Sequence, residues 1–442
     1  MEELKRYPEY KESGIEWIGE IPRGWTSGGV TKYLSSLVDY RGKTPEKVDE
    51  GVFLVTAKNI KNGQIDYSVS QEYVRKEEYQ EIMRRGIPLI GDVLFTTEAP
   101  LGEVANVNKT HIALAQRVIK FRAKEDVLYN YYLKYWMMSH GFQSNLQTFA
   151  TGSTAAGIKA SKLSKLVVLL PPYDEQKKIT NFLDEKTFEI ESLISEKEKL
   201  IELFEEKRQA IITEAVTKGL NTDVKMKDSG VEWIGEIPEH WEVGKLKYLS
   251  NEKMQYGANE SAELDDENLP RYIRITDIDK RGILKDETFK SLPWEKARNY
   301  ILSKNDILFA RSGATVGKTY IHDKEFDACY AGYLIRYKPN DNKIAPKFVY
   351  YFTQSGLYNN WVISNTIQAT IQNVSAEKYA NLSIPVPTLK EQKEIINYIS
   401  EQEKSIRRLQ DLIKIQIQKL NEYRQSLIHE AVTGKIDVRD YV

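Results

Sequence analysis

Residues with the potential for catalysis are scattered along the chain. None of the five histidines has metal-ligand spacing to another histidine or to the single cysteine. These residues are His111, His140, His240, His322, His429 and Cys329. The sequence contains no Gly-x-Ser-x-Gly motif, which would present a nucleophilic serine at a sharp turn. The residue types and their spacing therefore predict neither a zinc site nor a serine nucleophile.

Two short segments resemble loops of known enzymes, but each lacks a required feature. Gly313–Thr319 is similar to a phosphate-binding loop, yet only three residues separate its glycines where that loop needs four. Leu170–Tyr173 is similar to the Asn/Asp-Pro-Pro-Tyr loop of adenine methyltransferases, but Leu170 offers no acceptor for the target amino group. We interpret the first segment as a tight turn and the second as the boundary between a strand and a helix.

A different set of residues is suited to binding a nucleic acid. The predicted turns interleave cations with amides, hydroxyls and aromatic rings. Arginine can read guanine bidentately, Gln or Asn can read adenine, and Lys or Thr can hold phosphates. The candidates for DNA contact are Arg41, Lys43, Lys58, Asn59, Gln116, Arg117, Ser153, Thr154, Gln255, Tyr256, Arg274, Arg311, Ser312, Lys318, Gln368 and Gln372. A single charged turn is weak evidence for DNA binding. The interpretation therefore depends on how the parts of the chain that carry these residues are arranged.

The composition limits the class of protein. With 442 residues, 41% of them hydrophobic, the chain is long enough for two or more domains with cores of their own. A net charge of −1 argues against a uniformly basic nucleic-acid binder, but it permits a basic groove balanced by acidic helices. The chain has one cysteine, no apolar signal sequence after Met1 and no apolar run long enough to span a membrane. We therefore expect a cytoplasmic protein.

The chain contains a long internal repeat. The segment Ser13–Trp25 returns almost unchanged as Ser229–Trp241, at an offset of 216 residues. Asp92–Phe95 similarly corresponds to Asp306–Phe309, at an offset of 214. Outside such segments the two halves agree only thinly. We interpret the chain as an internal duplication. The closely repeated segments form a common framework, which holds two modules with diverged sequences.

Two long helices are predicted, one in each half. The first lies between Pro172 and Gly219 without an internal Pro or Gly, and the second covers about residues 390–432. Their apolar residues recur at intervals that are sums of three and four, the spacing of a coiled-coil seam. The predicted seam residues are Ile179, Leu183, Ile190, Leu193, Phe204, Ile211, Ile395, Ile399, Ile406, Leu409, Leu420 and Leu427. A helix of roughly 44 residues would be about 65 Å long, so each helix needs a partner helix.

Short strands are predicted within both modules. Runs rich in β-branched and aromatic residues, bounded by Gly, Asp or Asn, occur at residues 52–56, 92–97, 117–121, 271–275, 306–310 and 332–336. Two diverged modules on paired helices of about 65 Å would suit a split target with an unread spacer, since one turn of DNA rises about 34–36 Å.

The chain resembles the DNA-specificity (S) subunits of type I restriction-modification systems. The resemblance rests on the repeated Ser-Gly-x-Glu-Trp segments, on Asp39–Pro45 and on Asp306–Gly317. It also rests on the Pro-x-x-x-Glu-Gln helix starts at Pro171–Gln176 and Pro387–Gln392, and it covers nearly the whole chain. The implied fold is α+β, with two mixed α/β target-recognition domains, two long antiparallel coiled-coil helices and a pseudo-twofold internal repeat.

The resemblance also implies domain boundaries and roles. The expected parts are a first recognition domain (1–170), a first spacer helix (171–220), a second recognition domain (221–386), and a second helix with the C-terminal tail (387–442). Each recognition domain would bind one half of a bipartite sequence in double-stranded DNA, and the helices would set the spacer. A chain of this kind has no catalytic or metal-binding residues of its own.

Partners and cofactors follow from the same resemblance. Two methyltransferase (M) subunits and two restriction (R) subunits would assemble on the chain and bind S-adenosylmethionine, ATP and magnesium. The exposed helix faces, with their Glu-Gln starts, are the first candidates for the M-binding surface. The alternative is a methyltransferase or nuclease with its own unrecognised active site. It would need an S-adenosylmethionine loop or a carboxylate cluster on strands, and neither is legible in the sequence.

Overall fold

A computed structural model describes residues 5–40, 45–151, 156–366 and 373–441 of the chain. The chain divides into two compact units, Met1–Lys197 with Lys414–Val442, and Glu198–Ile413. Each unit consists of one mixed α/β domain and a part of each of the two long helices, α4 (Tyr173–Lys218) and α9 (Leu389–Val432). None of the described helices is long and apolar enough to cross a membrane.

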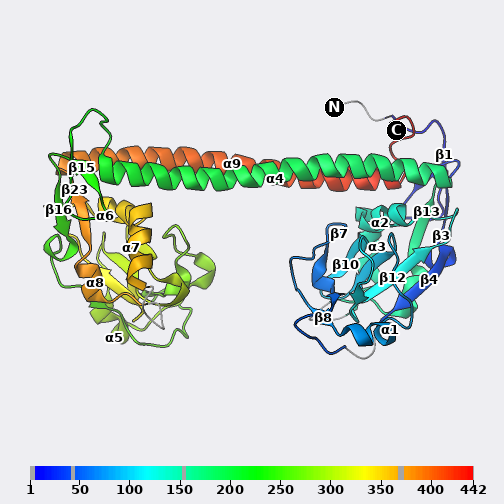
Figure 1. The fold of residues 1–442 in the computed structure, drawn as a ribbon, viewed down its shortest axis with the longest axis horizontal. Helices are drawn as coiled ribbons and strands as arrows, with labels where there is room; N and C mark the ends of the chain where they lie inside the picture. The colour runs from blue at the N-terminus through cyan, green and yellow to red at the C-terminus, as the bar shows by residue number, and fades with distance from the viewer. Residues whose placement is uncertain (1–4, 41–44, 152–155, 367–372, 442) are drawn as a thin grey trace. The chain divides into compact units, whose positions relative to one another are not determined.

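In its described residues, the first unit is built on short strands and short helices (Figure 1). Its strands are β1 (Tyr10–Glu12), β2 (Glu20–Pro22), β3 (Thr26–Gly29), β4 (Leu34–Asp39), β5 (Val52–Val55), β6 (Ile60–Lys61), β7 (Gln64–Ile65), β8 (Tyr73–Val74), β9 (Val93–Thr97), β10 (Leu101–Asn106), β11 (Ala113–Leu114), β12 (Val118–Ala123) and β13 (Val167–Leu170). Its helices besides α4 and α9 are α1 (Tyr79–Ile82), α2 (Asn130–Met138) and α3 (His140–Phe149).

The second unit contains a corresponding set of elements. Its strands are β14 (Met226–Asp228), β15 (Glu236–Pro238), β16 (Glu242–Lys245), β17 (Gln255–Tyr256), β18 (Arg271–Ile273), β19 (Ile307–Ala310), β20 (Thr319–Ile321), β21 (Ala328–Tyr330), β22 (Leu334–Tyr337) and β23 (Ser383–Val386). Its helices besides α4 and α9 are α5 (Trp294–Ala297), α6 (Pro346–Phe352), α7 (Gly356–Thr366) and α8 (Ala376–Ala380).

The two domains share one topology. The antiparallel sheet β10-β9-β12-β4 of the first has the same order as β20-β19-β22-β17 of the second. In each domain a second sheet contains one parallel pair, β5 with β11 and β18 with β21. The α+β class and the internal repeat are thus confirmed. The sequence indicated a close repeat only for the frame, whereas the structure shows that the backbone plan of the domains is repeated too.

The central strand of each domain explains how the layers are held together. Successive side chains of a strand point to opposite faces of its sheet. Val93 and Phe95 of β9 belong to the core cluster that contains α2 and the long helices, while Leu94 belongs to a second cluster with β5 and β11. In the other domain, Phe309 and Leu308 of β19 divide in the same way. Both faces of each central strand are therefore buried, as its continuous apolar run predicts.

Within each unit the two long helices pack side by side and antiparallel (Figure 1). In the first unit, Leu183 of α4 shares a core cluster with Leu427 of α9, and Lys197 donates to Gln416 over 2.7 Å. In the second unit, Ile212 of α4 shares a cluster with Ile399 of α9. The long helices predicted from the heptad pattern are therefore present as a packed pair.

The prediction of the seam is wrong at two positions. Leu193 and Leu409, which occupy equivalent positions in the repeat, are 45% and 44% exposed. One turn after the buried Ile190 the seam passes through Ile194, because a straight helix advances about 3.6 residues per turn and drifts away from a strict heptad. In α9 the corresponding seam position after Ile406 is the buried Gln410.

The repeated Trp segments join each domain to the ends of the helices. The indole of Trp25 donates to Glu175 at the start of α4 over 2.9 Å, and its ring lies against Gly434 after the end of α9. Trp241 contacts Glu391 at the start of α9 and Gly219 after α4 in the same manner. Both rings are buried. The duplicated segment is thus a packing element at the helix ends.

The glutamines of the Glu-Gln helix starts have a similar structural role. Gln176 and Gln392 are fully buried. Gln176 accepts a hydrogen bond from the backbone N–H of Tyr129 over 2.8 Å, and Gln392 accepts one from Ala345 over 2.6 Å. Their amides also donate to the carbonyls of Pro171 and Pro387. The prediction that these helix starts face an M subunit is wrong for the two glutamines, because they bind their own domains.

Truncation of a Trp at a helix end should destabilise its unit. We expect Trp241→Ala to lower the free energy of unfolding of the second unit by about 3–5 kcal/mol, since it removes a fully buried aromatic ring and leaves a cavity. Chemical denaturation followed by far-UV circular dichroism would measure the loss. Trp294→Ala, at a half-exposed position of the same unit, is the control and should change stability by less than about 1 kcal/mol. Equal losses in both variants would contradict the packing role.

The carboxylate that accepts from Trp241 also predicts a pH dependence. Burial alone would raise the pKa of Glu391, but hydrogen bonds with His240, Thr388 and Trp241 outweigh it and lower the pKa to about 2. A pKa that is lower in the folded than in the unfolded state adds stability above the unfolded value, near 4.5, and this stability is lost as the pH falls toward 2. Glu391→Gln should therefore reduce the fall in stability of the second unit between pH 5 and 3. The exposed control Glu232→Gln should leave that slope unchanged.

Candidate nucleic-acid interface

The second domain brings several predicted DNA-contact residues together after β19. Arg311 follows this strand directly, and its backbone is fixed on both sides: its N–H donates to Tyr333 over 3.0 Å, and its carbonyl accepts from Val374 over 2.9 Å. The neighbouring Ser312 forms a β-bridge with Asn373. Because two other segments hold this part of the backbone, the side chain of Arg311 has a defined position at the end of the strand.

The Arg311 side chain lies over an aromatic ring. Its guanidinium carbon is 4.7 Å from the centre of the Tyr256 ring, a cation–π distance, and its Nε donates a long 3.5 Å hydrogen bond to Asn373. The Tyr256 hydroxyl accepts from the backbone N–H of Ala376 over 3.1 Å, which fixes the ring. Tyr256 remains 42% exposed and the nearby turn residue Tyr333 61% exposed. This cluster, Arg311 with Tyr256 and Tyr333, offers a positioned cation and two accessible ring surfaces.

The first domain has different side chains at the equivalent place. Glu98 follows β9 and forms a β-bridge with Gly157, as Ser312 does with Asn373. Glu98 pairs with Arg117 over 3.0 Å, and both side chains are about half exposed. An exposed pair of this kind stabilises a fold by about 1 kcal/mol or less, so Arg117 can exchange its partner for a ligand at little cost. The two domains therefore present different chemistry on one backbone plan.

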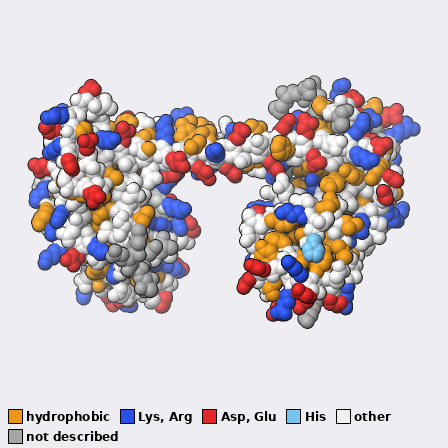
Figure 2. Space-filling view, viewed as in Figure 1, with side chains coloured by type: hydrophobic (Ala, Val, Ile, Leu, Met, Phe, Trp, Pro, Cys, Tyr) orange, Lys and Arg blue, Asp and Glu red, His pale blue; other side chains and the backbone are white. Residues whose placement is uncertain are grey.

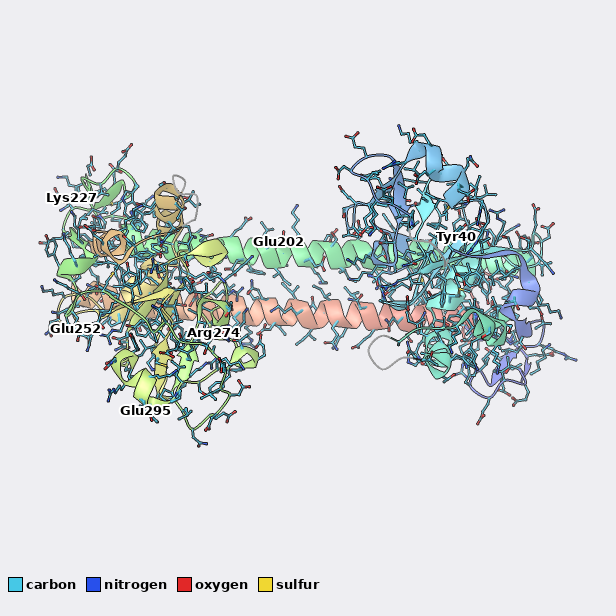
Figure 3. All side chains as sticks on the ribbon, turned by 90° about the horizontal axis from the view of Figure 1, so that it is seen from below. Tyr40, Glu202, Lys227, Glu252, Arg274 and Glu295 are labelled. Atoms are coloured by element: carbon cyan, nitrogen blue, oxygen red, sulfur yellow. The ribbon has the colours of Figure 1, made fainter. Side chains whose placement is uncertain are left out.

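An open cleft lies beside this place in the first domain. Its polar lining consists of Tyr40, Gln116, the two arginines Arg84 and Arg85, and the three glutamates Glu46, Glu78 and Glu81. The Tyr40 hydroxyl, labelled in Figure 3, donates to the carbonyl of Gly86. Burial, followed by the charge of Asp92, raises the pKa of Tyr40, so the hydroxyl stays protonated at neutral pH. Among the predicted contact residues that the structure describes, Gln116 lines this cleft.

A second structural feature recurs after β5 and β18, where the chain forms a short 3-10 turn. Asn59 closes the first turn, and Asp277 closes the second. Asn59 is fully buried, accepts from the backbone N–H of Thr56, and donates to the carbonyls of Asp66 and Val69. The prediction that Asn59 contacts DNA is therefore wrong, because its amide is used inside the turn. Lys58 beside it is exposed.

Several other predicted contact residues have partners within the second domain. Arg274 (Figure 3) donates to both oxygens of Asp277, over 3.0 and 2.8 Å, and also to the carbonyl of Thr288. The side chain of Gln255 accepts from Arg336 over 2.9 Å, and Lys318 donates to the carbonyl of Ile278 over 3.1 Å. Arg274 therefore stabilises the turn that Asp277 closes, whereas Arg311 lies in the cluster with Tyr256 and Tyr333.

Some predictions fall outside the described residues. These are Arg41, Lys43, Ser153, Thr154, Gln368 and Gln372. Conversely, the sequence reasoning missed Tyr333 and Asn373. Tyr333 follows Gly332 in a turn, and an aromatic residue next to a turn glycine is a signal that could have identified it. Nothing in the local sequence marks Asn373, because its role depends on a β-bridge with a distant strand.

The surface charges are mixed on the face shown in Figure 2, where Lys and Arg alternate with Asp and Glu over each domain. Among the described residues, no group of three or more His, Cys, Asp or Glu side chains is arranged to hold a metal ion. The features available for binding are therefore individual cations, amides and aromatic rings at the strand ends, rather than a uniformly basic face.

Comparison with known proteins identifies the family. Residues 38–203 and 238–420 match the type I restriction modification DNA specificity domain, in two copies. The chain therefore belongs to this family of DNA-specificity subunits, and the resemblance seen in its sequence is confirmed. Its role is that of a sequence-specificity subunit for DNA.

Individual relatives agree with this assignment. The chain is 24% identical to the type I restriction enzyme EcoBI specificity subunit of Escherichia coli, over 73% of this chain and 69% of that protein. It is 25% identical to the MjaVIII specificity subunit of Methanocaldococcus jannaschii, over 74% of this chain and 75% of the relative. A chain solved in work on assembly and conformational transition of the type I R-M system has the same fold, with a TM-score of 0.68, 16% identity and coverage of 93% of this chain and 98% of that one.

Proposed function

We propose that this chain is a non-catalytic subunit whose two domains each read one half of a bipartite DNA sequence, with the long helices setting the distance between the halves. The observation that carries the proposal is the repeat itself. One backbone plan occurs twice, while the residues at the end of the central strand differ: Arg311 and Ser312 in one domain, Thr97 and Glu98 in the other. Two domains with the same backbone plan but different contact residues are suited to binding two different half-sequences.

The partners in this proposal supply the chemistry. Two methyltransferase subunits would bind S-adenosylmethionine and methylate the target, and two restriction subunits would use ATP and magnesium. The chain's own contribution is to select the sequence. Isothermal titration of the isolated chain with S-adenosylmethionine tests the division of labour: we expect no binding heat, whereas clear stoichiometric binding would favour the alternative of an enzyme with its own site.

The sequence preference can be tested with the assembled complex. We expect the chain with its methyltransferase partner to retain, from a pool of random duplexes, molecules that share two short motifs at a fixed separation. The salt dependence of binding should be steep, because phosphate contacts release counterions. Retention of random duplexes without enrichment of any sequence would contradict the proposal.

A further inference from the structure

A turn in the second domain contacts the long helices of its own unit. The turn Asp279–Ile283 follows the capped 3-10 turn that ends at Asp277. The Asp279 carboxylate accepts from the backbone N–H groups of Arg281 and Ile283, each over 2.8 Å. The Tyr350 hydroxyl donates to the carbonyl of Arg281 over 2.6 Å. The backbone on both sides of the Arg281 side chain is thus fixed.

Glycine is required within this turn. Gly282 has a φ of +75°, and a Cβ there would lie 2.5 Å from the carbonyl oxygen of Thr319 and 2.7 Å from the Tyr350 hydroxyl. A left-handed backbone with neighbours this close admits no side chain without displacement. The close approach of the turn to β20 and α6 therefore depends on Gly282, and it directs Arg281 toward the helices.

The Arg281 side chain contacts both long helices. Its Nη2 donates to Glu205 of α4 over 2.5 Å and to Gln410 of α9 over 3.0 Å. Gln410 is 2% exposed and donates in turn to the carbonyl of Ile201 on α4 over 3.2 Å. A cation that bonds a carboxylate and a buried amide on two helices holds the domain at one place and one angle on the pair.

The acceptor carboxylate is itself held in place. Glu205 accepts from Arg208 over 2.8 Å, and Arg208 bonds Glu403 of α9 over 2.9 Å. Burial alone would raise the pKa of Glu205, but the neighbouring Arg208 and Arg281 lower it, so the carboxylate is charged at neutral pH. The contact is therefore an ionic network across α4, α9 and the domain.

The first domain makes a weaker contact with its turn at the equivalent place. Gln64, the first residue of β7, donates to Glu191 of α4 over 3.0 Å, and its exposed amide carries no charge. An amide that donates to one carboxylate contributes less than a guanidinium that forms an ion pair and a second bond with a buried amide. The two turns therefore differ in how strongly each binds the long helices of its own unit.

We propose that Arg281 is a positioning residue: by binding Glu205 and Gln410 it fixes the orientation of the second domain on the helix pair and so narrows the spacer length that the chain accepts. The inference rests on the proposed bipartite recognition. One base pair more or less in the spacer rotates a half-site by about 34–36° around the DNA axis. A domain held at one angle cannot follow this rotation, whereas a domain that has lost the contact follows it more easily.

The test is methylation of duplexes whose spacer is lengthened or shortened by one base pair, by the complete complex. We expect Arg281→Ala to reduce the preference for the native spacer by about tenfold, the effect of losing a hydrogen bond between charged groups, while the base preferences of both half-sites stay unchanged. Arg281→Lys, which keeps the charge and one hydrogen bond, should give an intermediate profile. The lysine variant also tests the proposal if the alanine variant does not fold.

Lys280→Ala is the matched control, because it removes the same charge from the same turn at an exposed position. It should retain the wild-type spacer profile. If the Arg281 variants discriminate spacers as sharply as Lys280→Ala, the positioning role is wrong although bipartite recognition stands. If the wild-type complex shows no spacer preference at all, the proposed function fails together with the inference.

Discussion

Arg311→Ala is expected to relax the base preference at one position of the second half-site and to leave the first half-site unchanged. A bidentate arginine–guanine contact discriminates against the wrong base by about 1–3 kcal/mol, which corresponds to roughly 5- to 150-fold. Arg311 is suited to this role because its backbone is fixed by Tyr333 and Val374, and its guanidinium lies over the Tyr256 ring. Methylation of a duplex library randomised at each position of both half-sites would measure the effect.

Arg311→Lys separates base reading from charge. Lysine keeps the cation but cannot form the planar bidentate contact, so base preference should fall while the affinity for the duplex stays close to that of the wild type. The exposed Arg298 of the same domain offers a control, and Arg298→Ala should preserve the sequence preference. If Arg311→Ala and Arg298→Ala have the same sequence preference as the wild type, the aromatic cluster does not read bases.

Removal of one heptad from each long helix is expected to shift the preferred spacer to a shorter length. We would delete residues 194–200 of α4 together with residues 412–418 of α9, segments that include the contact between Lys197 and Gln416. Seven residues at about 1.5 Å each shorten a helix by about 10.5 Å, equal to about three base pairs of 3.4 Å rise. Removal of a whole heptad turns the remaining part of each helix by only about 20°, so the apolar seam stays close to its register.

The measurement is the same methylation assay with a series of spacers. The doubly deleted chain should prefer a spacer shorter by up to about three base pairs. Its methylation rate should also be lower, because a shorter spacer rotates one half-site relative to the other around the DNA axis. Glu202→Ala, on the exposed surface of α4 (Figure 3), is the control and should keep the native spacer. A doubly deleted chain that folds and still prefers the native spacer would show that the helices do not set the distance.

The long helices could be predicted from the sequence because their determinants are local, whereas the domain type was implied by the resemblance to a family. Apolar spacing, the absence of Pro and Gly, and the Gly at each helix end act within a few residues of one another. The errors at Leu193 and Leu409 arose because a strict heptad was extended over a helix whose seam moves to Ile194 and Gln410. A buried polar Gln410 could not be recognised as a seam position from apolar periodicity.

The contact residues were less predictable because their environment is set by distant parts of the chain. Asn59 has the residue type of a base reader, but a buried turn uses its amide. Arg274 and Arg311 look equivalent in the sequence, and only the fold shows that Asp277 binds the first while Tyr256 lies beneath the second. The similar plan of the two domains was also hidden, since their strands share a pattern of burial rather than residue identities.

Mapping of methylated bases in a restriction-deficient host tests the central claim most directly. The host would carry this chain together with its methyltransferase partner, and its genome would be sequenced by a method that detects modified bases. We predict one motif made of two defined halves separated by a spacer of fixed length and undefined sequence, and loss of that motif when this chain alone is removed. A continuous motif, or a motif that persists without this chain, would contradict the account.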